Sequence, residues 1–101
     1  MGGLSLALTR ADKNKENMDY KAIANTPKSQ MVVGFKQVLK GIEEGTARCV
    51  VVASDSDSFI YEKVCETAKF YSVPIAECPS KAELGRLCRI DVPTATALIK
   101  E

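Results

Sequence analysis

The chain has 101 residues, 46% of them hydrophobic, which predicts one globular domain with its own core. It contains no histidine, and this excludes Ser-His-Asp and Cys-His nucleophiles and every zinc site that needs an imidazole ligand. The net charge is +1, but residues 1–48 hold eight basic and five acidic residues against six and eight in residues 49–101, so basic surface is expected mainly in the first half.

The first residues show no sign of a folded element. Residues 1–17 lack both helical and strand periodicity, and residues 9–17 are almost entirely polar. We expect a disordered, dispensable leader, followed by a single domain over residues 18–101, with Met18 as a candidate natural start. Because the chain has no secretory signal pattern and no run of 18 apolar residues, a soluble, cytoplasmic protein is expected.

The next elements are short ones followed by a longer helix. Residues 19–24 favour a short helix that ends before Pro27, because the residue preceding a proline avoids the helical conformation. Residues 31–33 are an extended apolar run. A helix is predicted over residues 34–44, where apolar side chains recur at helical spacing. The members of this apolar stripe are Phe35, Val38, Leu39 and Ile42.

Strands and helices alternate in the remainder of the chain. Residues 49–53 are continuously apolar, which is typical of a strand covered on both faces. Then follow a helix over 58–71, a strand over 73–78, a helix from Lys81 and a strand over 95–99. This order predicts parallel crossovers and a three-layer α/β/α sandwich with a small, mostly parallel or mixed sheet. The side chains expected to face inward from the two helices are Ile60, Val64, Ala68, Tyr71, Leu84, Leu87 and Cys88.

The four cysteines are predicted to be free thiols. Cys49, Cys65, Cys78 and Cys88 form no C-x-x-C pair, and each lies in an apolar segment. Such spacing fits buried thiols in a reducing compartment and no metal site.

Acidic residues follow the apolar strand at residues 54–58, Ser-Asp-Ser-Asp-Ser. Open α/β sheets bind ligands at such positions, so Asp55 and Asp57 could serve a small enzyme. The same residue types also cap helices, and capping is the favoured interpretation. A calcium loop is excluded because the position that needs glycine is Ile60.

The start of the helix over 34–44 combines features that suit a phosphate-rich partner. Gly34 permits close approach of a backbone, Lys36 and Lys40 lie one turn apart, and Gln37 can both donate and accept hydrogen bonds. Free N–H groups and positive charge at a helix start attract phosphate, and such side chains reach base edges. An ordinary solvated helix face is the alternative.

A second candidate is the turn at residues 90–93. Ile90, Asp91, Val92 and Pro93 place apolar side chains around a proline in a connection before the last strand. An exposed loop of this kind can pack against an unstacked base. The alternative is a simple helix-to-strand connection with its apolar side chains tucked under.

Four stretches resemble, in order and spacing, motifs of the ribosomal protein L7Ae/L30e family. Residues 34–40 (Gly-Phe-Lys-Gln-Val-Leu-Lys) resemble its G-T-[NK]-[EQ]-x-x-K helix, and residues 50–57 its apolar strand ending in A-x-D-A-D. Residues 73–75 resemble its G-[IV]-P segment. Residues 84–92 are similar to its L-G-K-A-C-G-I-x-V signature. The resemblance covers residues 19–100 and is strongest to short bacterial members.

The resemblance implies a non-enzymatic protein that binds kink-turn RNA, in which an internal loop carries tandem sheared G·A pairs. In the family, the start of this helix enters the widened groove and the late apolar loop packs against an extruded nucleotide. The implied groove residues are Gly34, Lys36, Gln37 and Lys40, and the implied loop residues are Ile90, Asp91, Val92 and Pro93. Ribosomal or other structured RNA, together with other ribonucleoprotein components, is the expected partner, without a cofactor.

Two positions depart from the family pattern, and two other functions stay open. Phe35 stands where the family usually has a small threonine, so its ring either crowds the RNA or joins the core. Arg89 stands where the family usually has glycine, so it either removes a tight helix end or adds a phosphate contact. The alternative functions are a protein-interaction module on the same scaffold and an α/β enzyme that uses Asp55 and Asp57.

Overall fold

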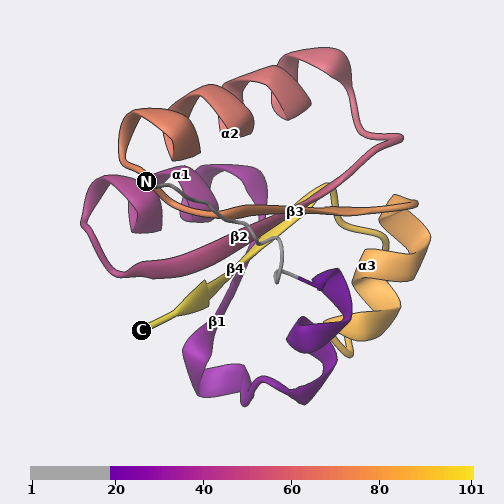
Figure 1. Cartoon of the computed structure of the whole chain (residues 1–101). Helices are drawn as coiled ribbons and strands as arrows, with labels where there is room; N and C mark the ends of the chain where they lie inside the picture. The colour runs from indigo at the N-terminus through magenta and orange to yellow at the C-terminus, as the bar shows by residue number, and fades with distance from the viewer. Residues whose placement is uncertain (1–18) are drawn as a thin grey trace, which may run out of the picture.

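The computed structural model describes residues 19–101, so the expected leader lies outside the described part of the chain. Within this part, two short 3₁₀ helices precede three α-helices and four strands (Figure 1). The predicted elements are present, with ends shifted by at most two residues. Their bounds are η1 Tyr20–Asn25, η2 Lys28–Gln30, β1 Met31–Val33, α1 Phe35–Glu43, β2 Ala47–Ala53, α2 Ser58–Phe70, β3 Ile75–Cys78, α3 Lys81–Leu87 and β4 Thr96–Lys100.

The sheet is mixed, with the strand order β1-β4-β2-β3. β2 and β3 are parallel, as expected for strands joined by a crossover helix, whereas β4 is antiparallel to both β1 and β2. The prediction of a parallel crossover is therefore wrong for β3-α3-β4. The reason is the length of α3, whose seven residues span only about 10 Å and cannot carry the chain back along the sheet.

Helices cover both faces of this sheet, which confirms the three-layer sandwich. α1 and α2 lie on one face, while α3 and η1 lie on the other (Figure 1). Side chains of β2 alternate between the two layers, because successive residues of a strand point to opposite faces. One core cluster includes Val38, Ile42, Val50, Val52, Val64, Ala68 and Leu98. The other includes Ile23, Cys49, Val51, Ala53, Leu84, Cys88 and Ala97.

Two expectations about the helices need correction. The short helix expected over residues 19–24 is the 3₁₀ helix η1, which Asp19 caps by accepting a hydrogen bond from the Lys21 N–H at 2.9 Å. Tyr71 does not face inward from α2. It follows the last helical residue and its side chain is 43% exposed. No helix in residues 19–101 is long and apolar enough to cross a membrane.

The cysteines are free, and burial perturbs all four. Cys49, Cys78 and Cys88 are buried and Cys65 is half-buried. Burial raises the pKa of each thiol, that of Cys88 to about 11. Because the thiolate is the reactive form, these thiols should be poor nucleophiles in the folded protein.

We expect iodoacetamide to modify Cys65 first and the other three cysteines slowly at mildly alkaline pH, because access and a raised pKa both limit the buried thiols. In denaturant all four should react rapidly and at similar rates. Mass spectrometry of timed samples distinguishes the sites. Modification of Cys88 in the native protein as fast as in denaturant would contradict the prediction.

Candidate nucleic-acid interface

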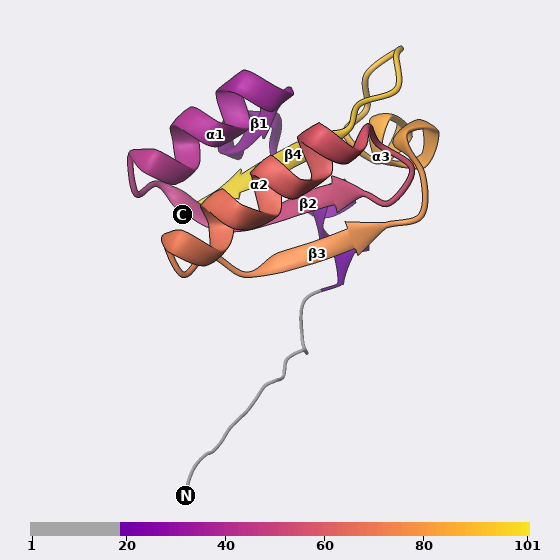
Figure 2. The same ribbon diagram turned by 90° about the horizontal axis from the view of Figure 1, so that it is seen from above.

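Both candidate site segments adjoin the same end of the strands in the sheet. The Gly34 N–H, at the end of β1, donates to the Thr96 carbonyl at 3.2 Å, at the start of β4. The Ala53 N–H, at the end of β2, donates to the Ala95 carbonyl at 2.8 Å. The start of α1 and the start of β4 are therefore neighbours, and the loop at residues 90–93 leads into β4. Figure 2 shows the right-hand end of α1 and the yellow loop before β4 toward the same end of the strands.

The start of α1 exposes the predicted polar side chains. Gly34 is the N-cap residue, with φ 110°, a backbone conformation that favours glycine. No side chain caps this helix end. Lys36, Gln37 and Lys40 are exposed, whereas Val38 on the opposite face is fully buried. The helix thus presents two amines and one amide to solvent beside uncapped backbone N–H groups.

The predicted loop is divided between core and surface. Ile90 is half-buried and packs against the core cluster under α3, so its side chain fits the alternative in which the apolar residues are tucked under the loop. Asp91, Val92 and Pro93 are exposed, and Val92 keeps 61% of its surface accessible. The apolar group that this loop offers a partner is therefore centred on Val92.

Gly85 holds this loop against α3, a role that sequence reasoning missed. A Cβ atom at position 85 would lie 2.2 Å from the Val92 carbonyl oxygen and 3.1 Å from the Pro93 Cα. Two hydrogen bonds fix the loop further, from the Ile90 N–H to the Gly85 carbonyl and from the Thr94 N–H to the Lys81 carbonyl. A glycine inside a helical pattern was the available signal, because it usually marks a close packing contact.

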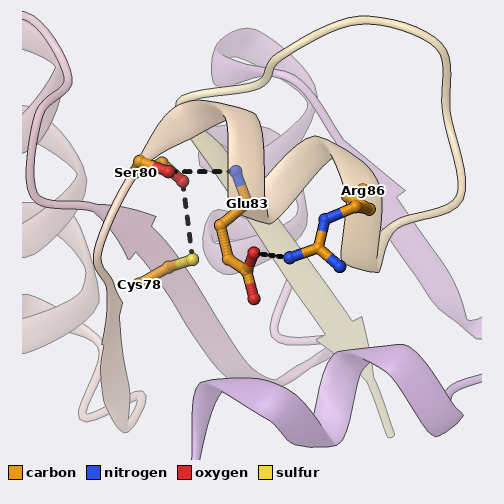
Figure 3. A network of polar contacts seen from close by, with 4 residues as sticks. All are labelled: Cys78, Ser80, Glu83 and Arg86. Carbon is orange, nitrogen blue, oxygen red and sulfur yellow. Dashed lines mark hydrogen bonds and ion pairs between the residues drawn. The ribbon is translucent and has the colours of Figure 1, made fainter.

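A cation beside the loop was also missed. Figure 3 shows α3 with Ser80 as its N-cap: the Glu83 N–H donates to the Ser80 hydroxyl at 3.0 Å. The Glu83 carboxylate pairs with Arg86, whose side chain is 72% exposed. Arg86 lines a hollow of about 280 Å³ together with the loop residues 90–93. Arg86 precedes Ile90 by four residues, and this spacing was the signal that its side chain lies near the loop.

The acidic residues after β2 act as helix caps. Asp57 accepts a hydrogen bond from the Phe59 N–H at 2.9 Å at the start of α2. Asp55 accepts one from the Lys81 N–H at 2.8 Å at the start of α3. Among the described residues there is no group of three or more side chains that could hold a metal ion. The geometry thus gives both aspartates the capping role that the sequence favoured.

Comparison with known proteins decides the family. The family model described as the ribosomal protein L7Ae/L30e/S12e/Gadd45 family matches residues 18–101. The chain belongs to this family. It is 39% identical over 82 residues to an RNA-binding protein of Geobacillus sp. (strain WCH70), a match that covers 81% of this chain and 98% of the relative. It is 33% identical over 84 residues to an RNA-binding protein of Halalkalibacterium halodurans, covering 83% of this chain and 100% of the relative.

Solved structures agree with this assignment to the L7Ae/L30e/S12e/Gadd45 family. A 15.5-kD RNA-binding protein of Giardia lamblia superposes with a TM-score of 0.70 and 30% identity. The superposition covers 81% of this chain and 68% of that protein. The mixed α/β sandwich of residues 19–101 is thus shared with a relative of known structure.

The first departure from the L7Ae/L30e pattern, Phe35, packs beside another aromatic ring. Its ring lies edge-on to Phe59 at a centroid distance of 6.0 Å, and it joins the core cluster under α1 and α2. Such edge-to-face pairs stabilise beyond the area that they bury. The structure therefore favours the core alternative for Phe35 and links the starts of α1 and α2.

The second departure, Arg89, preserves the tight helix end. Arg89 adopts the left-handed backbone conformation, with φ 62°, that a glycine would adopt there. Its guanidinium donates to the Ala24 carbonyl at 2.7 Å and to the Thr26 carbonyl at 2.6 Å, while the Lys28 amine donates to the Arg89 carbonyl at 3.0 Å. The tight helix end is therefore kept, and the side chain has a role that the sequence did not indicate: it fastens η1 to the end of α3.

We expect Arg89→Gly to lower the free energy of unfolding by about 1–2 kcal/mol, because charged hydrogen bonds to two carbonyls are lost while the left-handed backbone is kept without strain. Arg89→Ala should cost somewhat more, since alanine retains the strain. Urea unfolding followed by circular dichroism measures both. Equal stability of the parent and the glycine variant would show that the hydrogen bonds from Arg89 to Ala24 and Thr26 contribute nothing to the free energy of unfolding.

Proposed function

We propose that this protein binds structured RNA and recognises kink-turns, with α1 in the widened groove and the loop at residues 90–93 against an extruded nucleotide. The observation that supports the proposal is the Gly34–Thr96 hydrogen bond, because it holds the start of α1 beside the start of β4, the strand into which the loop at residues 90–93 leads. Membership of a family whose relatives are named RNA-binding proteins supports a binding protein and not an enzyme.

The side chains at the start of α1 and in the loop at residues 90–93 suit RNA. Lys36 and Lys40 supply positive charge, Gln37 supplies a donor and an acceptor for base edges, and the uncapped N-terminus of α1 attracts phosphate. Val92 offers apolar surface on which an unstacked base can rest. Arg86, which lines a hollow together with the loop residues 90–93, adds a third cation beside the loop.

The expected targets are ribosomal or other structured RNAs in the cytoplasm, in assemblies with other ribonucleoprotein components. The alternative is a protein-interaction module on the same scaffold. The two differ in what the edge at α1 and residues 90–93 contacts, so an RNA-binding assay separates them.

A gel-shift assay tests the proposal with two matched RNAs. The first is a simple kink-turn, and the second is the same duplex with its G·A pairs replaced by Watson–Crick pairs. We expect tight binding to the first RNA alone. Equal binding to both would leave only non-specific phosphate attraction, and binding to neither would favour the protein-interaction module.

We expect Val92→Ser to weaken kink-turn binding by about 1 kcal/mol without changing its salt dependence, because an apolar contact releases no counterion. Titrations at several salt concentrations measure both quantities. Phe70→Ser is the matched control. Phe70 is 80% exposed and is the last residue of α2, away from the loop at residues 90–93, so its replacement should not change RNA affinity. An altered salt slope for Val92→Ser would show that the loop acts through charge.

A further inference from the structure

The strand β3 forms an outer edge of the sheet. In the strand order β1-β4-β2-β3, β3 pairs with β2, and within residues 19–101 no strand pairs with its other side. Figure 2 shows β3 in orange at the margin of the sheet, beside α2. An open edge presents backbone donors and acceptors that another extended chain can use.

The outward groups of this edge are those of Ile75 and Glu77. The Pro74 carbonyl accepts from the Val50 N–H at 2.9 Å, and the Cys78 carbonyl accepts from the Ser54 N–H at 2.8 Å. Because residues of a strand alternate in the direction of their backbone groups, Pro74, Ala76 and Cys78 bond to β2. The N–H and carbonyl groups of Ile75 and Glu77 therefore point away from the sheet.

A groove of about 460 Å³ runs beside this edge, between α2 and β3. Ile75, Cys65 and the Tyr61 ring, all half-buried, give it apolar walls. The Tyr61 hydroxyl donates to the Glu77 carboxylate, and this hydrogen bond is the main cause that raises the pKa of Tyr61 to about 12. The phenol therefore stays neutral and keeps Glu77 at the mouth of the groove.

The charges around the groove are mainly negative. The exposed carboxylates of Glu62, Glu66 and Glu77 surround it, against the single amine of Lys69. RNA phosphates would be repelled from this surface. A second copy of the chain, paired edge to edge through β3, would bring two such sets of carboxylates together. A partner with positive side chains is the complementary choice.

We propose that the open edge of β3 binds an extended, lysine- or arginine-bearing segment of a partner protein, which adds as a further strand of the sheet. The outward backbone groups of Ile75 and Glu77 would pair with the added strand. Alternate side chains of that strand would enter the groove between α2 and β3 and meet Glu62, Glu66 or Glu77. This surface is distinct from the candidate RNA site at Gly34 and Val92, so RNA and the peptide can bind at the same time.

The test uses a six-residue probe peptide, Lys-Val-Lys-Val-Lys-Val, with both ends blocked, titrated into the folded protein and followed by amide NMR. We expect the amides of Ile75 and Glu77 to shift most, and to become protected from hydrogen exchange, because they acquire hydrogen-bond partners. Two peptides serve as controls: the same alternation with glutamate in place of lysine, and Lys-Lys-Lys-Val-Val-Val. The first should not bind, and the second should bind weakly without protecting the edge amides.

Variants of one residue separate charge from backbone pairing. Glu77→Gln should weaken binding about twofold to fivefold, as expected for one exposed ion pair. Glu77→Pro removes an outward N–H as well as the charge and should weaken binding about tenfold. The variant should still fold, because proline is tolerated on edge strands. Glu44→Gln, an exposed glutamate just after α1, is the matched control and should bind like the parent.

Several outcomes would overturn the proposal. These are shifts that spare Ile75 and Glu77, equal binding of the acidic peptide, the same amides shifting with kink-turn RNA, or a concentration-dependent dimer that Glu77→Pro abolishes. Circular dichroism confirms that each variant folds. If the proline variant unfolds, the triple variant Glu62→Gln, Glu66→Gln, Glu77→Gln decides, and undiminished binding to it would equally overturn the proposal.

Discussion

Replacing Gly85 with alanine is expected to lower the free energy of unfolding by about 2–3 kcal/mol and to weaken kink-turn binding at least about tenfold. The added Cβ would stand 2.2 Å from the Val92 carbonyl oxygen, which is backbone and cannot rotate away. Either α3 or the loop at residues 90–93 must move. Movement of the loop displaces Val92 relative to the start of α1.

Urea unfolding and RNA titration of the same variant measure the two effects of Gly85→Ala. Gly41→Ala is the matched control, because its added Cβ would meet only side-chain atoms, the two methyls of Leu98 at 3.1 and 3.6 Å and the Thr46 hydroxyl at 3.9 Å, and side chains can adjust. Gly41→Ala should cost less stability and leave RNA affinity unchanged. A Gly85→Ala variant that keeps both the stability and the affinity of the parent would contradict the close packing of this loop.

Lys40→Ala is expected to weaken kink-turn binding by about 1–3 kcal/mol. Lys40 is exposed on α1 one turn after Lys36, where its amine can reach phosphate or a guanine edge. If the contact is to phosphate, the slope of log affinity against log salt should fall by about 1. An unchanged slope with weaker binding would assign the amine to a base edge.

Lys69→Ala is the control for Lys40→Ala, because Lys69 is also exposed but lies in the last turn of α2. It should bind RNA like the parent. Circular dichroism must first show that both variants fold. If Lys40→Ala and Val92→Ser each bound as tightly as the parent, the proposed site would be wrong and the protein-interaction module would become the better explanation.

The spacing of apolar residues predicted the helices and strands, because in this protein the buried residues recur at the spacing of one helix face or one strand. Val38 and Ile42 are fully buried at helical spacing, and β2 is buried on both faces as its apolar run requires. The polar face of α1 follows from the same spacing. These features depend on neighbours only a few residues away, so a sequence pattern can indicate them.

The remaining features depend on contacts between distant segments. The direction of β4 depends on the length of α3, and the burial of Ile90 depends on the core beneath it. Arg89 bonds to carbonyls of Ala24 and Thr26, 65 and 63 residues away. No local pattern encodes such partners, so the sequence could mark Arg89 as unusual without indicating its role.

The position of β4 bears on how the chain folds during synthesis. β4 is the last strand of the chain, yet it lies between β1 and β2, and the Thr96 hydroxyl donates to the Val51 carbonyl at 2.8 Å. The sheet therefore cannot close until residues 96–100 have left the ribosome. Until then the apolar strands β1 and β2 stay unpaired at the gap that β4 will fill, so the nascent chain should expose strand edges on which chaperones can act.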